Sequence, residues 1–349
     1  MQLNDLLNHQ SQWLKDTGPN SNIVISSRIR LARNLEKIPF PHWADKSQGE
    51  KTLAVAVKAM EKASFLKGST VFGLSELDNI DKQFLVERHL MSYEHTQKPN
   101  HKAVVVDQEE IVSIMVNEED HLRMQVMQSG FNLFEAWGII NKIDDCLAKE
   151  LNYAFLPDWG YLTACPTNTG TGMRGSVMLH LPALVMTRAI DRVLAAAAKL
   201  SFTTRGLYGE GTQAMGNFFQ LSNQVSLGLS EDDIVANING LIRQVIDQEN
   251  QARETMLSKN KALLEDRVNR SLGILKNAHI ISSQETIELL SMVRLGYDLG
   301  MIKNIQRSRI NELFIITQPA HLQKLEGKRL SSQERDVKRA DIVRSKLNI

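Results

Sequence analysis

The stretch Asn22-Ile23-Val24-Ile25-Ser26-Ser27-Arg28-Ile29-Arg30 decides how the rest of the chain is interpreted. Residues 22–26 are rich in β-branched residues and follow the breaker pair at 18–19, which predicts a strand. Arg28 and Arg30 are two residues apart, so on a strand their side chains share one face and reach the same anion. Guanidinium groups bind phosphate oxygens bidentately and stay charged at any working pH, so a triphosphate is the natural anion.

Composition places this stretch in a globular enzyme-sized chain. Its 349 residues favour two domains, or one domain with an appendage, and 42% apolar with 23% charged residues exclude a disordered or collagen-like protein. The net charge of +1 gives no reason to expect nucleic acid as a direct partner. Two cysteines without metal-ligand spacing predict a cytoplasmic location, and no export signal or membrane-spanning apolar run is recognisable.

The pattern on either side of the opening strand predicts an α+β fold, in which a mainly antiparallel sheet is flanked by helices. A short helix is expected within 1–20, and 103–107 with 111–116 predict a hairpin. Several strands are expected between 161 and 223. Helical periodicity is found at 50–92, 132–151 and 187–200.

The last third of the chain is predicted to be helical. Ser230-Glu231-Asp232-Asp233 and Ser282-Ser283-Gln284-Glu285 both look like helix-start signals, and no strand pattern is convincing between 230 and 299. We therefore divide the chain into an N-terminal helical segment, 1–21, a catalytic domain, 22–253, and a helical C-terminal domain, 254–349.

The glycine run Gly170-Thr171-Gly172-Met173-Arg174-Gly175 does not belong to either familiar nucleotide loop. It leads into the strand-like 177–182 rather than into a helix, which removes the dinucleotide-binding context. The strand lysine, catalytic-loop Asp and Asp-Phe-Gly of ordinary protein kinases are not found, and neither is a phosphate loop ending in Lys-Ser or Lys-Thr.

Arginines beside glycines and turns form the remaining phosphate-binding pattern: Arg28, Arg30, Arg123, Arg174 and Arg205. Each is expected at a strand edge or in a loop. A single arginine is usually an ordinary surface residue. As a set, they can form a cage that stabilises a metaphosphate-like transition state without a Walker lysine.

Carboxylates complete the pattern. Asn117-Glu118-Glu119-Asp120-His121-Leu122-Arg123 follows a strand, where functional residues often lie, and Glu210 sits in a glycine-flanked turn. Read alone, these acids are more often a solvated loop, and His89 and His121 are more often ordinary histidines than catalysts. Cys165 precedes the glycine run, where nearby arginines would lower its pKa.

These motifs, in this order, resemble the guanidino (phosphagen) kinases, the family of arginine and creatine kinases. The resemblance spans residues 22 to about 253 and implies ATP and Mg²⁺ as cofactors, with Mg²⁺ held mainly by ATP rather than by protein ligands. It implies that Glu119 and Glu210 hold the guanidinium, with Cys165 and Asp120 beside them at the catalytic centre. The ATP site that it implies contains Ser26, Ser27, Arg28, Ile29, Arg30, His89, Arg123, Arg174, Gly175, Ser176, Val177, Met178, Arg205, Gly206, Leu207, Tyr208, Gly209 and Glu210.

Two departures make the chain similar to the bacterial protein-arginine kinases, one branch of that family. Metabolic members carry a helical domain of roughly a hundred residues ahead of the arginine motif, a typical domain size, whereas here only 25 residues precede Ser26. An open site suits a polypeptide substrate. Met178 also stands where metabolic members usually place a histidine at the adenine.

The C-terminal stretch Arg335-Asp336-Val337-Lys338-Arg339-Ala340 places Arg335 and Arg339 on one face of a helix, where both can reach a phosphate. By the resemblance, Arg335, Asp336, Arg339 and Ala340 form an allosteric phosphoarginine pocket. The resemblance also implies a homodimer, a heat-shock repressor among the protein substrates, a zinc-containing activator protein and a Clp-type unfoldase-protease.

Two other functions stay open. A small-molecule arginine kinase would use the same arginine cage, but the missing N-terminal domain opposes it. An adaptor that binds phosphoarginine without catalysis is opposed by the intact set of Glu119, Glu210 and arginines. The resemblance favours ATP-dependent phosphorylation of arginine side chains in proteins, and it implies that this marks them for regulation or degradation during stress.

Overall fold

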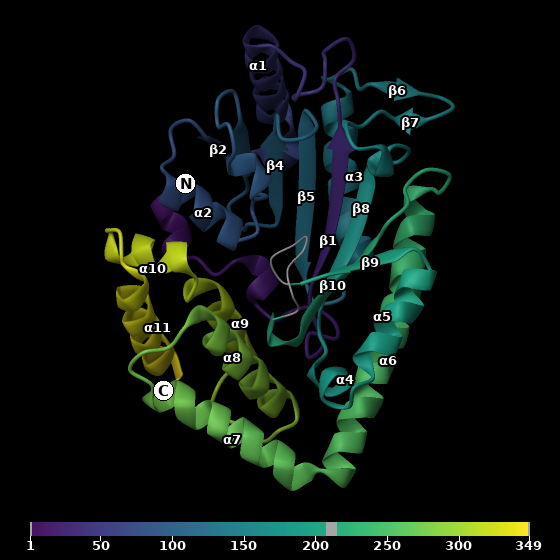
Figure 1. Cartoon of the computed structure of the whole chain (residues 1–349). Helices are drawn as coiled ribbons and strands as arrows, with labels where there is room; N and C mark the ends of the chain where they lie inside the picture. The colour runs from purple at the N-terminus through teal and green to yellow at the C-terminus, as the bar shows by residue number, and fades with distance from the viewer. Residues whose placement is uncertain (1, 207–214, 348–349) are drawn as a thin grey trace.

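The computed structural model describes residues 2–206 and 215–347 (Figure 1). Its centre is an antiparallel sheet of eight strands in the order β2-β3-β4-β5-β1-β8-β10-β9. The strands are β1 (Val24–Arg33), β2 (Thr70–Gly73), β3 (Ala103–Val106), β4 (Val112–Val116), β5 (Leu122–Ser129), β8 (Met173–His180), β9 (Phe202–Arg205) and β10 (Phe218–Asn223). The short strands β6 (Phe155–Leu156) and β7 (Gly160–Tyr161) pair with each other apart from this sheet.

Strand β1 lies in the middle of the sheet, where it pairs with β5 on one side and β8 on the other. Because side chains alternate along a strand, Ile29 and Leu31 enter the hydrophobic core while Arg28 and Arg30 lie on the opposite face. The strand continues to Arg33, past the predicted end at Ser26. The two arginines therefore lie inside a central strand.

Helices α3 (Leu133–Ala148) and α6 (Glu231–Lys259) cover the apolar face of the sheet. Their buried residues, such as Ile140 and Ile238, share one core with Ile29 of β1 and Val177 of β8. Helix α1 (Lys46–Lys62) packs at β4, and α5 (Ile190–Lys199) packs at β9. This face of the sheet is therefore occupied by helices, which leaves the other face for a site.

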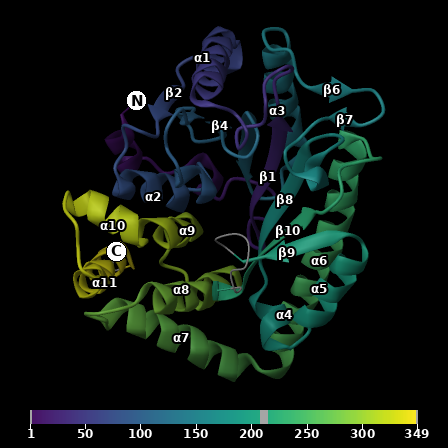
Figure 2. The same cartoon turned by 45° about the horizontal axis from the view of Figure 1, so that its top comes forward.

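The C-terminal helices pack against the end of the sheet where β1 begins (Figures 1 and 2). They are α7 (Lys261–Asn277), α8 (Ser283–Asp298), α9 (Arg307–Ile316), α10 (Pro319–Glu326) and α11 (Ser332–Leu347). Their hydrophobic core includes Trp13, Ile25, Met127 and Met178. Residues from the N-terminal segment and three central strands therefore belong to the core of the C-terminal helices.

Short helices complete the described part of the chain. The two α-helices are α2 (Asn79–Glu87) and α4 (Pro182–Met186), and the 3₁₀ turns are η1 (Leu3–Asn8), η2 (Gln12–Leu14), η3 (Ser64–Leu66), η4 (Glu94–Thr96), η5 (Pro166–Asn168) and η6 (Met215–Asn217). Within residues 2–206 and 215–347, every helix is too short or too polar to pass through a lipid bilayer.

Buried ionic groups fasten the C-terminal helices to the start of β1. Arg294 of α8 is fully buried and donates hydrogen bonds to the carbonyl oxygens of Ser21 and Asn22. Asp298, on the same helix, pairs with Arg253 of α6 and with Arg307. Helix α6 runs through Arg253 without a break, and the division of the chain at 253 stays a prediction.

The structure confirms the α+β architecture, the antiparallel sheet and the helical C-terminal region. Helices begin after Ser230 and after Ser282, whose hydroxyls both cap their helix. Residues 2–20 contain two separate 3₁₀ turns where one short helix was expected, and β2 at 70–73 interrupts the stretch expected to be helical. The expectation that each arginine lies at a strand edge or in a loop was wrong for the two in β1.

Candidate active site

Strand register brings the predicted arginines to one face of the sheet. Arg30 of β1 pairs with Arg174 of β8, and Ala32 pairs with Arg123 of β5. Residues directly opposite each other in a sheet point to the same side, as do every second residue along a strand. Gln220 of β10 pairs with Met178 of β8 on one side and with Arg205 of β9 on the other, so by the same rule Arg205 also points to this face. The sheet therefore carries five guanidinium groups on the face that α3 and α6 leave uncovered.

These arginines repel one another in surroundings from which water is largely removed. Burial, followed by the charges of Arg123, Arg174 and Arg205, lowers the pKa of Arg28 to about 9. Burial and the same neighbours, with Arg28, hold the pKa of Arg30 well below its ordinary value. A guanidinium keeps its proton in proteins, so these lowered pKa values mean that the charged arginines repel one another. A bound anion would relieve this repulsion.

Arg30 is the clearest sign that an anion belongs here. It is buried, and its Nε and Nη2 atoms meet no acceptor among the described residues. By contrast, Arg28 Nη2 donates to Gln220 Oε1 at 2.9 Å. A buried donor without an acceptor costs free energy, which a phosphate oxygen on this face would recover.

Arg123 is neutralised by a neighbour that sequence reasoning did not assign. Its Nη1 atom contacts both carboxylate oxygens of Glu118, at 2.6 and 2.8 Å. Burial raises the pKa of Glu118, but Arg123 and a hydrogen bond from Ser92 outweigh it, so that the pKa falls to about 2. Glu118 therefore stays ionised and fixes the orientation of Arg123.

A small pocket opens beside Arg28 on the arginine face. Its lining residues are Trp13, Ser26, Arg28, His89, Met127, Ser176, Met178 and Gln220. Burial, and secondarily Arg28, lowers the pKa of His89 to about 4, so its ring is neutral at pH 7. The pocket has a volume of only about 20 Å³, but its lining combines flat and apolar side chains with one guanidinium, the side-chain types that contact a heteroaromatic ring attached to an anion.

The carboxylate motif forms the turn between β4 and β5. Asn117 closes the turn by donating its N–H to the carbonyl oxygen of His121. His121 Nδ1 accepts from the N–H of Leu35, so Nε2 carries the proton and donates to the carbonyl oxygen of Pro39. Both ring nitrogens are thus used inside the protein, while Glu119 at the turn is exposed.

Asp120 holds this turn against the segment that leads to Cys165. Its Oδ1 atom accepts from Asn34 Nδ2 at 2.6 Å and from the N–H of Ala164 at 2.7 Å. Asp120 is buried and joins the side chain of Asn34 to the backbone at Ala164. Cys165 is partly buried, with Sγ 3.0 Å from Thr167 Oγ1.

Several predicted residues point away from the arginine face. Ile29 and Val177 are in the apolar core, and a side chain at Gly175 would clash with Ile238 of α6. Ser27 donates its hydroxyl to the carbonyl oxygen of Gly130 and accepts from Asn132 N–H. We therefore leave Ser27, Ile29, Gly175 and Val177 out of the side chains that can contact ATP, because strand alternation turns them toward the helices.

The second predicted catalytic carboxylate is not covered by the structure. Leu207, Tyr208, Gly209 and Glu210 lie outside the described residues. Gly206 is buried next to the end of β9. Within residues 2–206 and 215–347, no group of three or more His, Cys, Asp or Glu side chains is arranged to hold a metal ion.

Comparison with known families agrees with this geometry. The family model described as ATP:guanido phosphotransferase, C-terminal catalytic domain, matches residues 51–252. The chain belongs to this family. A second model, the protein-arginine kinase McsB C-terminal domain, matches residues 261–349 and places the chain in the protein-arginine kinase branch of the guanido phosphotransferases.

Similar proteins support the same assignment over the full length. The protein-arginine kinase of Halothermothrix orenii is 46% identical over 100% of both chains, and that of Brevibacillus brevis is 48% identical over 98% of this chain and 96% of its own. Among solved structures, a lombricine kinase is 27% identical, with a TM-score of 0.60, over 69% of each chain. The duplicated taurocyamine kinase from Schistosoma mansoni is 27% identical, with a TM-score of 0.62, over 68% of this chain and 34% of its own.

The C-terminal motif of this guanido phosphotransferase lies on α11. Arg339 is buried and donates to the carbonyl oxygens of Thr317 and Ile281, and it pairs with Asp336. Arg335 is partly exposed and donates to the carbonyl oxygen of Leu330 at 2.8 Å. Ala340 is buried next to Arg339.

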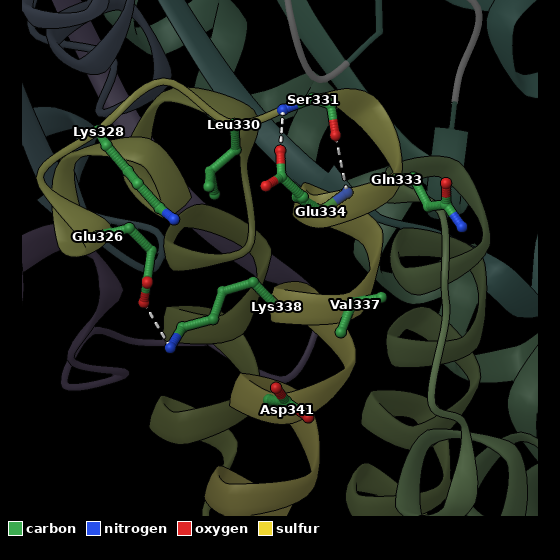
Figure 3. A pocket seen from close by; sticks show the side chains of 9 residues that line it. All are labelled: Glu326, Lys328, Leu330, Ser331, Gln333, Glu334, Val337, Lys338 and Asp341. Atoms are coloured by element: carbon green, nitrogen blue, oxygen red, sulfur yellow. Dashed lines mark hydrogen bonds and ion pairs between the residues drawn. The ribbon is translucent and has the colours of Figure 1, made fainter.

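A pocket of about 480 Å³ lies between α10 and α11 (Figure 3). It is lined by Glu326, Lys328, Leu330, Ser331, Gln333, Glu334, Val337, Lys338 and Asp341. Neither Arg335 nor Arg339 is among these residues, so this pocket and the motif arginines use different faces of α11. Inside the pocket, Lys338 is paired with Glu326.

Proposed function

We propose that this chain is an ATP-dependent protein-arginine kinase, which transfers the γ-phosphoryl group of Mg-ATP to arginine side chains in proteins. The observation that carries the proposal is the arginine face of the sheet, with Arg30 donors at its centre that meet no acceptor in 2–206 and 215–347, and with exposed Glu119 in the adjoining turn. The match of residues 261–349 to the protein-arginine kinase C-terminal domain supports a protein substrate.

The chemistry needs an anion clamp and a base. In the proposed step, a guanidinium nitrogen of the substrate forms a bond to the γ-phosphorus as the bond to the bridging oxygen breaks, ADP leaves and one proton is lost. Glu119, with Glu210, would accept hydrogen bonds from the guanidinium, and one of them would take the proton. Arg28, Arg30, Arg123, Arg174 and Arg205 would neutralise the phosphoryl oxygens, and Mg²⁺ would be held by the phosphates of ATP.

The pocket beside Arg28 is the proposed adenine site. Trp13 and His89 supply aromatic surfaces that meet edge to face with centroids 5.4 Å apart, and Met127 and Met178 supply polarisable apolar contacts. Ser26, Ser176 and Gln220 complete it with polar groups. In this proposal Cys165 touches the substrate guanidinium, and Asp120 acts as an anchor rather than as a catalyst.

The proposal is tested by incubating the full chain with Mg-ATP and an unfolded arginine-containing protein, followed by mass spectrometry without acid treatment. We expect acid-labile phosphate on arginine side chains, because a phosphoramidate bond is lost in acid. Transfer to free arginine alone would identify a small-molecule arginine kinase instead. Binding of phosphoarginine without any transfer would favour an adaptor.

The wider setting is part of the same proposal and is drawn from the family resemblance. It includes a heat-shock repressor among the substrates, a zinc-containing activator protein, a Clp-type unfoldase-protease that degrades marked proteins, and a homodimer. A cytoplasmic location fits the two free cysteines. The marking of proteins during stress would then couple phosphorylation to regulation or degradation.

We further propose that Arg335, Asp336, Arg339 and Ala340 form a regulatory phosphoarginine site, with Arg335 as the residue that meets the phosphate. Arg339 is committed to three protein acceptors, whereas Arg335 is partly exposed and donates to one backbone carbonyl. Arg335→Ala is expected to weaken phosphoarginine binding roughly tenfold or more, the loss of one charged hydrogen-bonded contact. Titration calorimetry with phosphoarginine measures it.

Arg329→Ala is the matched control, because Arg329 is an exposed arginine of the preceding loop. Basal turnover with Mg-ATP is expected to remain within twofold in Arg335→Ala. Unchanged phosphoarginine affinity in this variant would remove the assignment.

A further inference from the structure

The end of helix α2 brings three consecutive side chains to three different parts of the molecule. Glu87 is the last residue of α2, Arg88 is its C-cap, and His89 follows with a positive φ of 59°. Glu87 reaches α10, Arg88 reaches the N-terminal segment and α10, and His89 lines the proposed adenine site. One turn of backbone therefore joins the C-terminal helices to the nucleotide pocket.

Glu87 caps helix α10 from a distant part of the chain. Its carboxylate accepts from the N–H of Ala320 at 2.9 and 3.0 Å and from the N–H of His321 at 3.1 Å. The residue at the N-cap position, Gln318, makes no side-chain cap bond. The N-terminus of a helix offers a carboxylate unsatisfied N–H groups and positive polarity, which partly offset the burial that raises the pKa of Glu87 to about 7.

Arg88 connects helix α10 to the N-terminal segment. It is 2% exposed, and its guanidinium forms a buried ion pair with Glu110, with Nε 2.7 Å from Oε2. Its Nη2 atom also donates to Ser11 Oγ and to the carbonyl oxygen of His9, both at 2.9 Å. The 3₁₀ turn that follows Ser11 contains Trp13, which lines the nucleotide pocket.

His321 links the two residues. Burial, and then the charge of Arg88, holds the pKa of His321 well below its ordinary value, so the ring is neutral. Arg88 Nη1 lies 3.2 Å from His321 Nε2, and because arginine only donates, Nε2 is the acceptor. Nδ1 therefore carries the proton and donates to Glu87 Oε2 at 3.3 Å.

The backbone of His89, which follows Arg88 directly, is held by two hydrogen bonds. Its N–H donates to the carbonyl oxygen of Val86, and its carbonyl oxygen accepts from Gln125 Nε2. A positive φ is uncommon in residues other than glycine and persists only where the surroundings fix it. The backbone that carries its ring into the pocket is therefore held by Val86 of α2 and Gln125 of β5, directly next to Arg88 in the chain.

We propose that Glu87 and Arg88 are positioning residues through which the seating of α10 sets the affinity of the pocket for Mg-ATP. This inference rests on the proposed function, because it takes the pocket beside Arg28 as the nucleotide site. The motif on α11 contacts the same region, since Arg339 Nε donates to the carbonyl oxygen of Thr317, immediately before the α10 N-cap. Glu87 and Arg339 thus both bind the same short segment, 317–321.

The test compares full-length wild type with Glu87→Gln and Arg88→Lys. We expect the KM for Mg-ATP and the dissociation constant for Mg-ADP to rise about tenfold or more, with kcat and the KM for an arginine-containing protein changed less than twofold. A residue that only supports folding would lower stability without this split between KM and kcat. Melting temperature is measured on each variant to separate the two effects.

Asp81→Asn is the matched control. Asp81 pairs with Lys324 of α10 at 2.5 Å and is not one of the residues that line the pocket beside Arg28. It is expected to leave the KM for Mg-ATP unchanged. An equal rise of the KM for Mg-ATP in Asp81→Asn, or no rise in Glu87→Gln and Arg88→Lys, would overturn the proposed role of Glu87 and Arg88.

A second measurement needs no variant. Coupling between two sites is reciprocal, so Mg-ATP must stabilise the segment that sets its affinity. We expect saturating Mg-ATP to slow amide hydrogen exchange at 320–321 in the wild type several-fold, without an effect in α7. Unchanged exchange at 320–321 in protein that binds Mg-ATP would contradict the inference, whereas wild type that binds no Mg-ATP would contradict the proposed function itself.

Discussion

Glu119→Gln is expected to lower the rate of phosphoryl transfer to protein arginine by about 10²- to 10⁴-fold, the usual contribution of a positioned acid or base. The amide keeps the size of the side chain but cannot take a proton or attract the guanidinium. Mg-ATP binding should stay within threefold, because Glu119 belongs to the acceptor side of the site. Single-turnover transfer and Mg-ADP titration measure the two quantities separately.

Glu109→Gln is the control for this experiment. Glu109 is an exposed carboxylate in the connection between β3 and β4, where it forms an ion pair with Lys15. Its replacement should leave turnover unchanged. Near-normal turnover in Glu119→Gln would remove Glu119 from the proposed mechanism and leave Glu210 as the candidate base.

Arg30→Met is expected to separate binding from stability. The variant should bind Mg-ADP roughly 10- to 100-fold more weakly, because a charged hydrogen bond to phosphate is lost. In the absence of nucleotide it should also be more stable than the wild type by about 1–4 kcal/mol, as when other buried charged groups are replaced by apolar ones. Urea unfolding without ligand and Mg-ADP titration test the two halves.

The informative part of this result is that the affinity for Mg-ADP falls while the stability of the ligand-free protein rises. Arg30 is buried among like charges with two donor atoms that meet no acceptor in the described residues, so the ligand-free fold gains nothing from it. The exposed Arg192 of α5 offers a control, Arg192→Met, expected to change neither quantity. Lower stability together with unchanged Mg-ADP affinity in Arg30→Met would show that Arg30 is structural.

The sequence was sufficient for those parts of the fold that depend on short-range patterns. Ser230 and Ser282 start helices because a hydroxyl can accept from an N–H three residues later, and this is visible in the local sequence. The hairpin at 103–116 is equally local. The position of β1 between β5 and β8 was not predictable in this way, since it depends on residues far along the chain.

The candidate site was likewise predictable only where it depends on local sequence. Arg28, Arg30 and the carboxylate turn could be chosen from residue type and spacing, but whether the chosen residues share a face depends on register. Period-two alternation would have excluded Ile29 and Val177 as side-chain ligands, because their neighbours Arg28 and Ser176 take the opposite face. Taking whole motifs as binding segments hid this distinction.

Other residues of the pocket carry no sequence signal. Met127 enters because it pairs with Arg28 across β1 and β5, and Gln220 because it pairs with Met178. Trp13 comes from the N-terminal segment, which sequence patterns described only as helical. The cap that Glu87 provides to α10 joins positions far apart in the chain, so local capping rules could not find it.

The central place of β1 has a consequence for how the protein is made. Ser26 is synthesised early, but its neighbours in the finished sheet are Ser129 and Met178, which follow much later. Until both have left the ribosome, at a rate of about 5–20 residues per second, β1 has open edges on both sides. Such non-local pairing slows folding and exposes strand edges to wrong partners. We therefore expect this chain to need protection from aggregation during its own synthesis.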